Sequence, residues 1–210
     1  MLTRLLTLNP ECAEDRKYGR IVRTLDEGGV IVYPTDTFYG LGADCFAAAA
    51  VRRIYELKKR DPSKPLLVVI ADVDMAGRVA SALPPIFLEL ASKFWPGPLT
   101  LTLKASPAVP REVLGEGDSI AVRMPDVLWL RALIRQAGYP LVATSANISG
   151  EKEISTAEEA LAQFRGKVDL IVDGGRTPGV RPSTVLDLTG DKPRLVREGA
   201  LPRTELEKYL

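Results

Sequence analysis

The stretch Tyr33–Asp44, YPTDTFYGLGAD, decides how the surrounding chain is interpreted. It follows the apolar run GGVIV, which is typical of a buried strand, and precedes AAAAVRRIYELKKR, which is typical of a helix. Connections between elements in compact domains usually have roughly four to six residues. This connection is longer and combines threonine, aspartate, aromatic residues and glycine, so its composition indicates a specific role.

Short apolar runs separated by helix-like segments predict about seven strands. The earlier runs are VIVY, PLLVVIA, LTLTLK, SIAVRMP, PLVATS and VDLIVDGG. The alternation in LTLTLK predicts a strand with one polar face. STVLDL and PRLVRE then follow each other without a helix between them. We therefore predict an α/β (α+β) fold with a mixed parallel and antiparallel sheet.

About six helices are predicted around this sheet. Asn9 followed by Pro10 is typical of a helix start, and Ser155 with Glu158 is typical of a capping box before the helix AEEALAQFRG. The predicted helices cover residues 9–26, 47–59, 84–94 and 127–137, the segment after Ser155, and a short C-terminal helix in PRTELEKYL.

The chain has 210 residues, a length that suits one large α/β domain. We find no internal repeat, linker or low-complexity segment, so we predict a single domain over residues 1–210 with a core at about 14–201. A chain of this size buries roughly 70% of its unfolded surface, which allows a sizeable core.

The composition excludes several kinds of chemistry. The sequence has no histidine, which excludes a histidine base, a Ser-His-Asp triad and histidine metal ligands. The net charge of +1 indicates neither nucleic acid nor membrane as a general partner. Any chemistry must therefore depend on charge stabilisation and positioning by other groups, and we predict no protein metal site.

The cysteines and the N-terminus indicate a cellular compartment. Cys12 and Cys45 form neither a disulfide framework nor a zinc motif, and a reduced compartment is the simplest interpretation. The N-terminus lacks the apolar stretch of a signal peptide, and no run approaches the length of a membrane span. We expect a soluble cytoplasmic protein.

Polar residues follow several predicted strands, where ligands bind in open α/β sheets. Arg123 ends SIAVR among apolar neighbours, so it needs an anionic partner, which is either an internal Asp or Glu or a substrate carboxylate. KKRDPSKP, residues 58–65, fits either cations at a helix C-terminus or a phosphate clamp. SANISG, residues 145–150, fits either a turn or an anion-binding loop.

Taken together and in this order, seven blocks resemble the YrdC/TsaC family, the threonylcarbamoyl-AMP synthases. They span about Gly28 to Leu201, nearly the whole chain, and the pair KxR and SxN with the Tyr-Pro-Thr block is the most specific combination. The blocks are VIVYPTDTFYGLGAD, YELKKRDPSKPL, FWPGPLTL, IAVRMP, LVATSANISG, PSTVLDL and VREGAL.

The resemblance implies a twisted, open, mixed sheet with a concave basic face. It also implies an enzyme that makes threonylcarbamoyl-AMP and pyrophosphate from L-threonine, bicarbonate and ATP, with Mg²⁺ accompanying ATP and no tightly bound cofactor. A separate transferase passes the threonylcarbamoyl group to an adenosine of tRNA. RNA binding is also attached to the family, so tRNA or double-stranded RNA is a further candidate partner.

The site residues that the resemblance implies fall into two sets. Lys58 and Arg60 would be catalytic and contact the ATP phosphates. The remaining ATP contacts would be Lys64, Ser119, Ser145, Asn147 and Arg197, and the threonine contacts would be Thr37, Arg123 and Ser183, with Arg123 on the carboxylate. The stretch that includes Thr37 would then form one wall of the amino-acid pocket. We interpret Tyr39 as core packing.

The sequence departs from the family pattern at three positions. Lys59 and Asp61 flank Arg60 where we expect glycine and often proline, and Val69 stands where many members carry histidine near the threonine pocket. These departures bear on substrate affinity and leave the reaction class unchanged. The chain also ends soon after VREGAL, so it resembles the short form of the family.

Three rival interpretations remain. A YciO-like relative would share the fold without the synthase activity, but to our reading that branch departs at KxR and SxN, which are present here. An RNA-binding module would use the concave face. The net charge of +1 and the lack of an aromatic-rich basic stretch argue against this interpretation. A carbamoyl-transfer domain of hydrogenase maturation factors would occur in a longer chain with companion domains.

Overall fold

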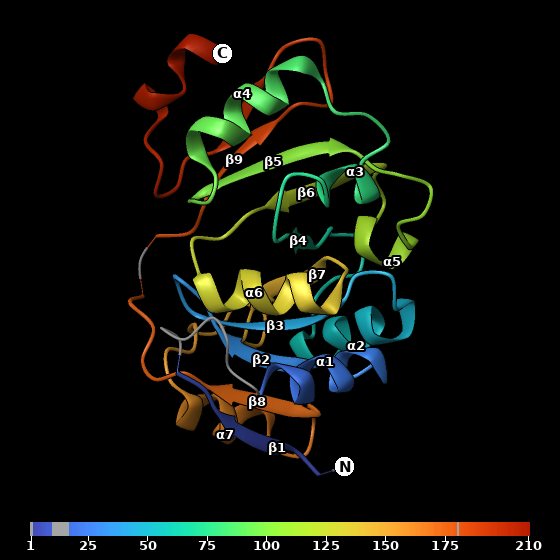
Figure 1. The fold of residues 1–210 in the computed structure, drawn as a ribbon, viewed down its shortest axis with the longest axis vertical. Helices are drawn as coiled ribbons and strands as arrows, with labels where there is room; N and C mark the ends of the chain where they lie inside the picture. Colours follow the sequence, from blue (N-terminus) through green and yellow to red (C-terminus); the bar gives the residue numbers. More distant parts are fainter. Residues whose placement is uncertain (1, 10–16, 180) are drawn as a thin grey trace.

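The computed structural model describes residues 2–9, 17–179 and 181–210 (Figure 1). One sheet has the strand order β1-β8-β2-β3-β7-β4-β6-β5-β9-β10. Its bounds are β1 Arg4–Thr7, β2 Ile31–Pro34, β3 Tyr39–Asp44, β4 Leu67–Val69, β5 Leu99–Lys104, β6 Ser119–Arg123, β7 Leu141–Ser145, β8 Leu170–Asp173, β9 Thr184–Asp187 and β10 Arg194–Arg197. The predicted mixed sheet is confirmed, but it has ten strands instead of about seven.

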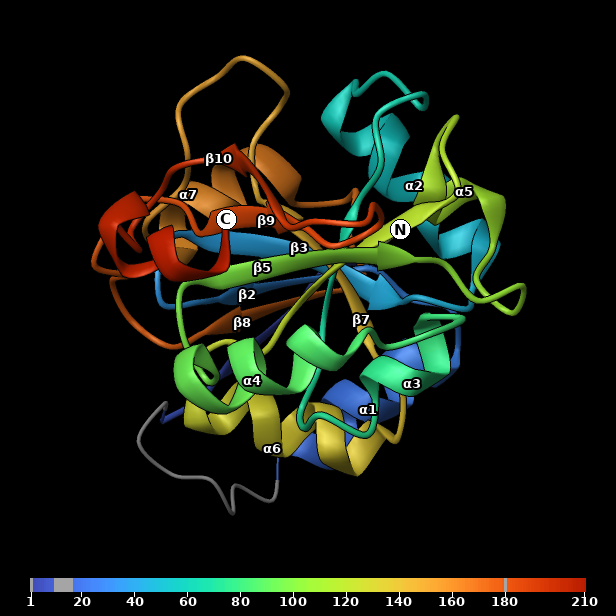
Figure 2. The same cartoon turned by 90° about the horizontal axis from the view of Figure 1, so that it is seen from above.

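Helices cover both faces of the sheet. Figure 2 shows α1, α3, α4 and α6 on one face and α2, α5 and α7 on the other. The bounds are α1 Tyr18–Asp26, α2 Ala48–Lys58, α3 Ala76–Val79, α4 Pro85–Phe94, α5 Arg111–Leu114, α6 Leu128–Ala137 and α7 Ala157–Phe164. Within the described ranges, no helix combines the length and apolar character that crossing a membrane requires.

The second half of the opening stretch is a strand, which the sequence analysis missed. Strand β3 lies between β2 and β7 and pairs antiparallel with both. Only Thr35–Phe38 remain as the turn between β2 and β3. Glycine is depleted in strands, so Gly40 and Gly42 made this segment difficult to predict as a strand. Glycine is needed at position 42 because a Cβ there would lie 2.5 Å from Tyr33 Cε1.

The N-terminal segment also differs from the prediction. Residues 4–7 form β1, parallel to β8 at the edge of the sheet. Leu6 is the only buried residue of this strand, so its sequence carries no clear apolar period. The predicted helix is observed from Tyr18 onward, and the predicted start at Pro10 lies outside the described residues.

Two predicted details shift at other elements. In β5 the predicted polar face is present, but its first residue is enclosed. Thr100 is 2% exposed and its hydroxyl lies 2.8 Å from Ser183 Oγ, whereas Thr102 is half-buried and Lys104 is exposed. At α7 the capping box lies one residue later than predicted. Thr156 Oγ1 accepts from the Glu159 amide at 3.3 Å, and Glu159 Oε2 accepts from the Ser155 amide at 2.7 Å.

The predicted C-terminal helix is replaced by two single 3-10 turns, η1 Arg203–Glu205 and η2 Glu207–Tyr209. The Tyr209 ring packs edge-on against Phe94 of α4, at 6.1 Å between centroids. Because aromatic packing holds this segment, it needs no continuous helical pattern.

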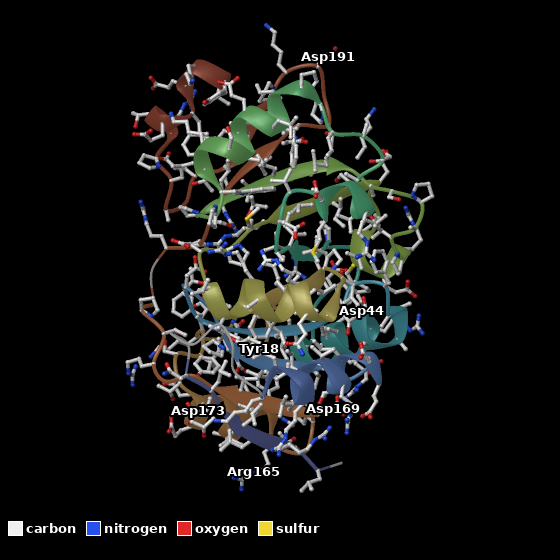
Figure 3. All side chains as sticks on the ribbon, in the orientation of Figure 1. Tyr18, Asp44, Arg165, Asp169, Asp173 and Asp191 are labelled. Carbon is white, nitrogen blue, oxygen red and sulfur yellow. The ribbon has the colours of Figure 1, made fainter. Side chains whose placement is uncertain are left out.

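Asp169, labelled in Figure 3, joins three elements of the fold. Its Oδ2 accepts from the Val30 amide at 2.8 Å, and Arg53 Nη1 of α2 lies 3.0 Å from the same oxygen. Its own amide donates to the Val30 carbonyl at 3.0 Å. One carboxylate therefore fixes α2 and the start of β2 against β8.

Helix α2 ends in a left-handed residue that is not glycine. Lys59 has φ 49° and ψ 39°, and no other non-glycine residue of the described ranges has positive φ. A left-handed residue lets the amides of the helix end bond back to its carbonyls, and here Arg60 N donates to Tyr55 O at 3.0 Å. The expectation of glycine at this position therefore has a backbone cause.

The Tyr33–Gly42 contact generates a stability prediction. We expect Gly42→Ala to lower the free energy of unfolding by about 1–3 kcal/mol, because the added methyl group overpacks against the Tyr33 ring. Gly40→Ala is the matched control, since its Cβ would meet no atom closer than 3.4 Å. Urea denaturation followed by circular dichroism measures both, and equal losses would contradict the explanation.

The helix end generates a second prediction. Lys59→Gly should raise the free energy of unfolding by about 1 kcal/mol, because glycine adopts the left-handed conformation without the Cβ penalty. Lys59→Ala removes the same charge but keeps a Cβ, so it should bring no gain. Thermal and urea unfolding compare the two variants, and a gain in both would assign the effect to charge instead of backbone strain.

Candidate active site

A buried lysine joins the end of α2 to the loop after β7. Lys58 is 2% exposed, and its Nζ donates to the carbonyls of Ser145 at 2.5 Å and Asn147 at 2.8 Å and to Asn147 Oδ1 at 3.1 Å. An ammonium group has three donors, so this ring of oxygens uses all of them. The Ser149 amide donates back to the Lys58 carbonyl at 2.8 Å. The KxR and SxN motifs are thus one structural unit.

Asn147 is the centre of this loop. Its Oδ1 also accepts from Ser145 Oγ at 2.6 Å, and its Nδ2 donates to the Glu151 carbonyl at 2.6 Å. Burial, and to a lesser degree Arg60, lower the pKa of Lys58 to about 8, whereas the three oxygens favour the charged form. The buried ammonium therefore depends on these three oxygens for its hydrogen bonds.

Arg60, Lys64 and Ser119 border the same end of α2. Arg60 Nη2 donates to the Pro65 carbonyl at 3.0 Å, while its buried Nε has no hydrogen-bond partner among the described residues. Lys64 is exposed. Glu116, just before Ser119, donates its amide to the Ser63 carbonyl at 3.2 Å. The loop before Ser119 therefore packs against the segment that carries Arg60 and Lys64.

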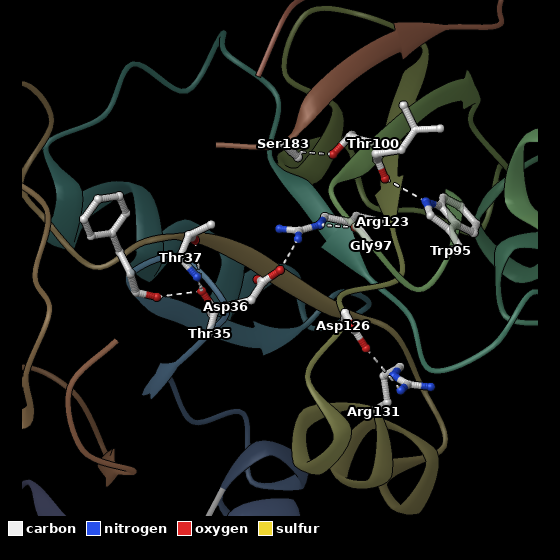
Figure 4. Close-up of polar contacts among 12 residues, drawn as sticks. Thr35, Asp36, Thr37, Trp95, Gly97, Thr100, Arg123, Asp126, Arg131 and Ser183 are labelled. Atoms are coloured by element: carbon white, nitrogen blue, oxygen red, sulfur yellow. Dashed lines mark hydrogen bonds and ion pairs between the residues drawn. The ribbon is translucent and has the colours of Figure 1, made fainter. Parts of the chain in front are cut away.

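A second polar centre surrounds Arg123 at the end of β6. Its guanidinium forms an ion pair with Asp36 through Nη2 and Oδ2, and its Nε donates to the Gly97 carbonyl at 2.9 Å. Figure 4 shows the two charged groups pointing toward one another. Of the partners that the sequence left open, an internal aspartate is present. Val69 adjoins Arg123 in the β4–β6 ladder.

The turn that carries Asp36 is held by a threonine hydroxyl. Thr35 Oγ1 donates to the Phe38 carbonyl at 2.7 Å and accepts from the Thr37 amide at 3.1 Å (Figure 4). The Thr37 hydroxyl lies 3.1 Å from the same oxygen, and the Thr37 carbonyl accepts from the Gly179 amide at 2.8 Å. A short hydroxyl-capped turn therefore presents Asp36 and Thr37.

Ser183 and Arg197 are joined to each other. Arg197 donates from Nε at 3.2 Å and from Nη2 at 2.8 Å to the Ser183 carbonyl, while the Ser183 hydroxyl lies 2.8 Å from Thr100 Oγ1. In Figure 4 the Thr100–Ser183 pair and the Thr35–Thr37 turn lie on either side of the Arg123 guanidinium. Arg197, expected on ATP, is thus bonded to a residue of the predicted threonine set.

Tyr39 links the two centres from inside the core. It is 0% exposed, and its hydroxyl donates to the Gly175 carbonyl at 2.7 Å. Burial raises its pKa to about 12. Its carbonyl accepts from the Ala146 amide at 2.7 Å, so the strand start after Thr37 lies beside the SxN loop. The interpretation of Tyr39 as a packed core residue is confirmed.

Two cavities of about 450 Å³ each flank α2. One includes Arg60 with Tyr55 and Arg52, and the other includes Ile148 with Arg53 and Lys167; Lys59 lines both. Neither is lined by Arg123. No group of three or more described Cys, Asp or Glu residues is arranged to hold a metal ion.

Sequence reasoning missed Asp36 and Thr100 as parts of this region. An aspartate between two threonines in TDT could have been a signal for a turn that presents a carboxylate. Thr100 carried no such signal, because the alternation in β5 assigned it only to the polar face of the strand. The role of Lys58 as the centre of an oxygen ring depends on a loop 87 residues away.

Comparisons with known proteins identify relatives of this chain by sequence and by fold. The family model for the Sua5, YciO and YrdC proteins, described as "Telomere recombination", matches residues 23–199. A threonylcarbamoyl-AMP synthase of Pyrococcus abyssi is 43% identical over 184 residues, 88% of this chain and 54% of that protein. The synthase of that name from Bacillus subtilis is 38% identical over 197 residues, 93% of this chain and 57% of that protein.

Solved structures resemble the whole chain. P. abyssi Sua5 complexed with L-threonine has a TM-score of 0.90 and 38% identity, covering 100% of this chain and 61% of that one. E. coli YciO has a TM-score of 0.86 and 30% identity and covers 100% of both chains. The chain spans little more than half the length of the curated synthases it matches. It belongs to the Sua5/YciO/YrdC family.

Proposed function

We propose that this chain is a threonylcarbamoyl-AMP synthase, a nucleotidyltransferase that makes threonylcarbamoyl-AMP and pyrophosphate from L-threonine, bicarbonate and ATP. Two relatives carry this name at 43% and 38% identity, and P. abyssi Sua5 has been crystallised with L-threonine. The observation that carries the proposal is the joining of Lys58 of KxR to Ser145 and Asn147 of SxN.

The two polar centres suit the two larger substrates. The cluster of Lys58, Arg60 and Lys64 supplies cations for the ATP phosphates, with the SxN loop beside it. The cluster of Thr37, Arg123 and Ser183 supplies a guanidinium and hydroxyls for an amino acid with a carboxylate and a hydroxyl group. Tyr39, the first residue of β3 and two residues after Thr37, joins them, since its carbonyl accepts from the Ala146 amide of the SxN loop.

The reaction we propose needs no histidine. The threonine amine attacks carbon dioxide with loss of a proton, or bicarbonate with loss of water, to form a carbamate. A carbamate oxygen then attacks the α-phosphate of ATP, and pyrophosphate leaves. The protein holds the reactants in line and neutralises the charge that develops on the phosphates. Lys58 would exchange hydrogen bonds with the SxN loop for hydrogen bonds to phosphate, so it serves both loop and nucleotide.

We place Mg²⁺ on the phosphates of ATP instead of on a protein site. Mg²⁺ keeps several water ligands and binds through phosphates with one or two carboxylates. The described residues provide no cluster of three carboxylates or thiols, which suits delivery of the ion with the nucleotide. When bound, it neutralises the charge of the leaving pyrophosphate.

The cellular role that we propose follows from the product. A downstream tRNA transferase in the cytoplasm would receive the threonylcarbamoyl group, and tRNA or double-stranded RNA is a further candidate partner. YciO is the rival, because it matches this chain over the full length of both. The presence of Lys58, Arg60, Ser145 and Asn147 favours the synthase.

Mass spectrometry of purified protein with ATP, Mg²⁺, bicarbonate and L-threonine tests the proposal, with L-serine as the control substrate. We expect a threonine-dependent threonylcarbamoyl-AMP peak together with pyrophosphate release. Folded protein that binds ATP but makes no product would favour the YciO-like interpretation.

Loss of the cations at the end of α2 should slow turnover. We expect Lys58→Ala and Arg60→Ala each to lower kcat by about 100-fold or more, the scale for losing one preorganised charge contact. Lys192→Ala, at an exposed lysine on the β9–β10 turn, is the matched control. Steady-state kinetics with circular dichroism measure the effect, and unchanged turnover in both variants would remove the phosphate-clamp assignment.

Loss of Arg123 should act on the amino acid. Arg123→Ala should raise KM for L-threonine by roughly tenfold to a hundredfold, the scale of a hydrogen bond between charged groups, with a smaller effect on KM for ATP. Arg131→Ala removes a neighbouring arginine that pairs with Asp126 at 3.7 Å and serves as the control. Equal effects on both KM values would reject the carboxylate role.

A further inference from the structure

The Asp36 carboxylate beside Arg123 has few hydrogen-bond partners among the described residues. Its side chain is 25% exposed and that of Arg123 is 8% exposed. Its Oδ1 is buried with no hydrogen-bond partner, and its Oδ2 meets Arg123 Nη2. Within the described part of the chain, one hydrogen bond therefore serves a carboxylate that offers about four acceptor sites.

The exposed part of the Asp36 side chain is on the Oδ2 side. Oδ1 is buried, so the 25% exposure of the side chain belongs to Oδ2 and the carbon atoms beside it. Each carboxylate oxygen offers about two acceptor sites, so Oδ2 can accept from a second cationic donor in addition to Arg123 Nη2. A small cation that approached the exposed edge would therefore contact Oδ2 next to the guanidinium of Arg123.

An α-amino acid carries complementary charges at this spacing. Its carboxylate and its ammonium group are attached to the same carbon atom, so an acidic and a basic side chain that lie next to each other complement both. Asp36 and Arg123 are such a pair, and Figure 4 shows them facing one another. Among the described residues, hydrogen bonds engage Nε and Nη2 of Arg123 and leave Nη1 for a ligand.

We propose that Asp36 binds the α-ammonium group of the amino acid whose carboxylate Arg123 receives. This inference rests on the proposed function and adds a residue that selects α-amino acids at that site. The alternative is that Asp36 only orients Arg123. The Gly97 carbonyl already holds Arg123 Nε at 2.9 Å, so Arg123 keeps an anchor when the charge of Asp36 is removed.

Isothermal titration calorimetry with two ligands separates these roles. One ligand is L-threonine, and the other is its α-hydroxy analogue, in which a hydroxyl group replaces the ammonium group. We expect Asp36→Asn to lower affinity for L-threonine by about tenfold or more and to leave affinity for the analogue within about threefold. Asparagine keeps an acceptor for Arg123 but loses the charge. Asp126→Asn is the matched control, since Asp126 pairs with Arg131 instead.

Each result decides between the two roles. Parallel loss of affinity for both ligands in Asp36→Asn, or no loss for either, overturns the inference alone. The wild-type protein adds a test that does not depend on a folded variant, because it should bind L-threonine at least about tenfold more tightly than the analogue, and equal affinities overturn the inference. A wild-type protein that binds no L-threonine would overturn the proposed function as well.

Discussion

The ion pair between Asp36 and Arg123 joins parts of the sheet that are not neighbours. Strands β3, β7 and β4 separate β2 from β6 in the strand order. Asp36 lies in the turn between β2 and β3, and this turn reaches the end of β6, where Arg123 lies. The residues of the proposed amino-acid pocket lie around this contact (Figure 4).

A second constraint is the burial of a cation. The Lys58 ammonium is removed from water, and hydrogen bonds to three oxygens of the SxN loop offset the free-energy cost of its burial. Because the loop follows β7 and β7 pairs with β3, the position of this cation is coupled to the strand that begins just after Thr37. The polar centres around Lys58 and around Arg123 therefore share one framework, in which β3 is the common element.

The candidate site contains no histidine. Its charged groups are arginine, lysine and aspartate, each of which is held by backbone carbonyls or by another charge. Such groups position and neutralise substrates more readily than they exchange protons near neutral pH. The structure also places two of the departures from the family pattern. Lys59 is the left-handed residue at the end of α2, and Val69 pairs with Arg123 in the ladder between β4 and β6.

The sequence alone determined the mixed sheet, most helices and the blocks that carry Lys58, Arg60, Ser145, Asn147 and Arg123, because apolar periodicity and short motifs are local signals. Strands β1 and β3 escaped it, since an exposed edge and paired glycines carry no such signal. Three contacts were decided only by the tertiary structure. Asp36 forms an ion pair with Arg123, Arg197 donates to the Ser183 carbonyl, and Lys58 donates to the loop after β7. Those contacts depend on the strand order and on the positions of the loops, which arise from packing across the whole chain and cannot be predicted from any short stretch.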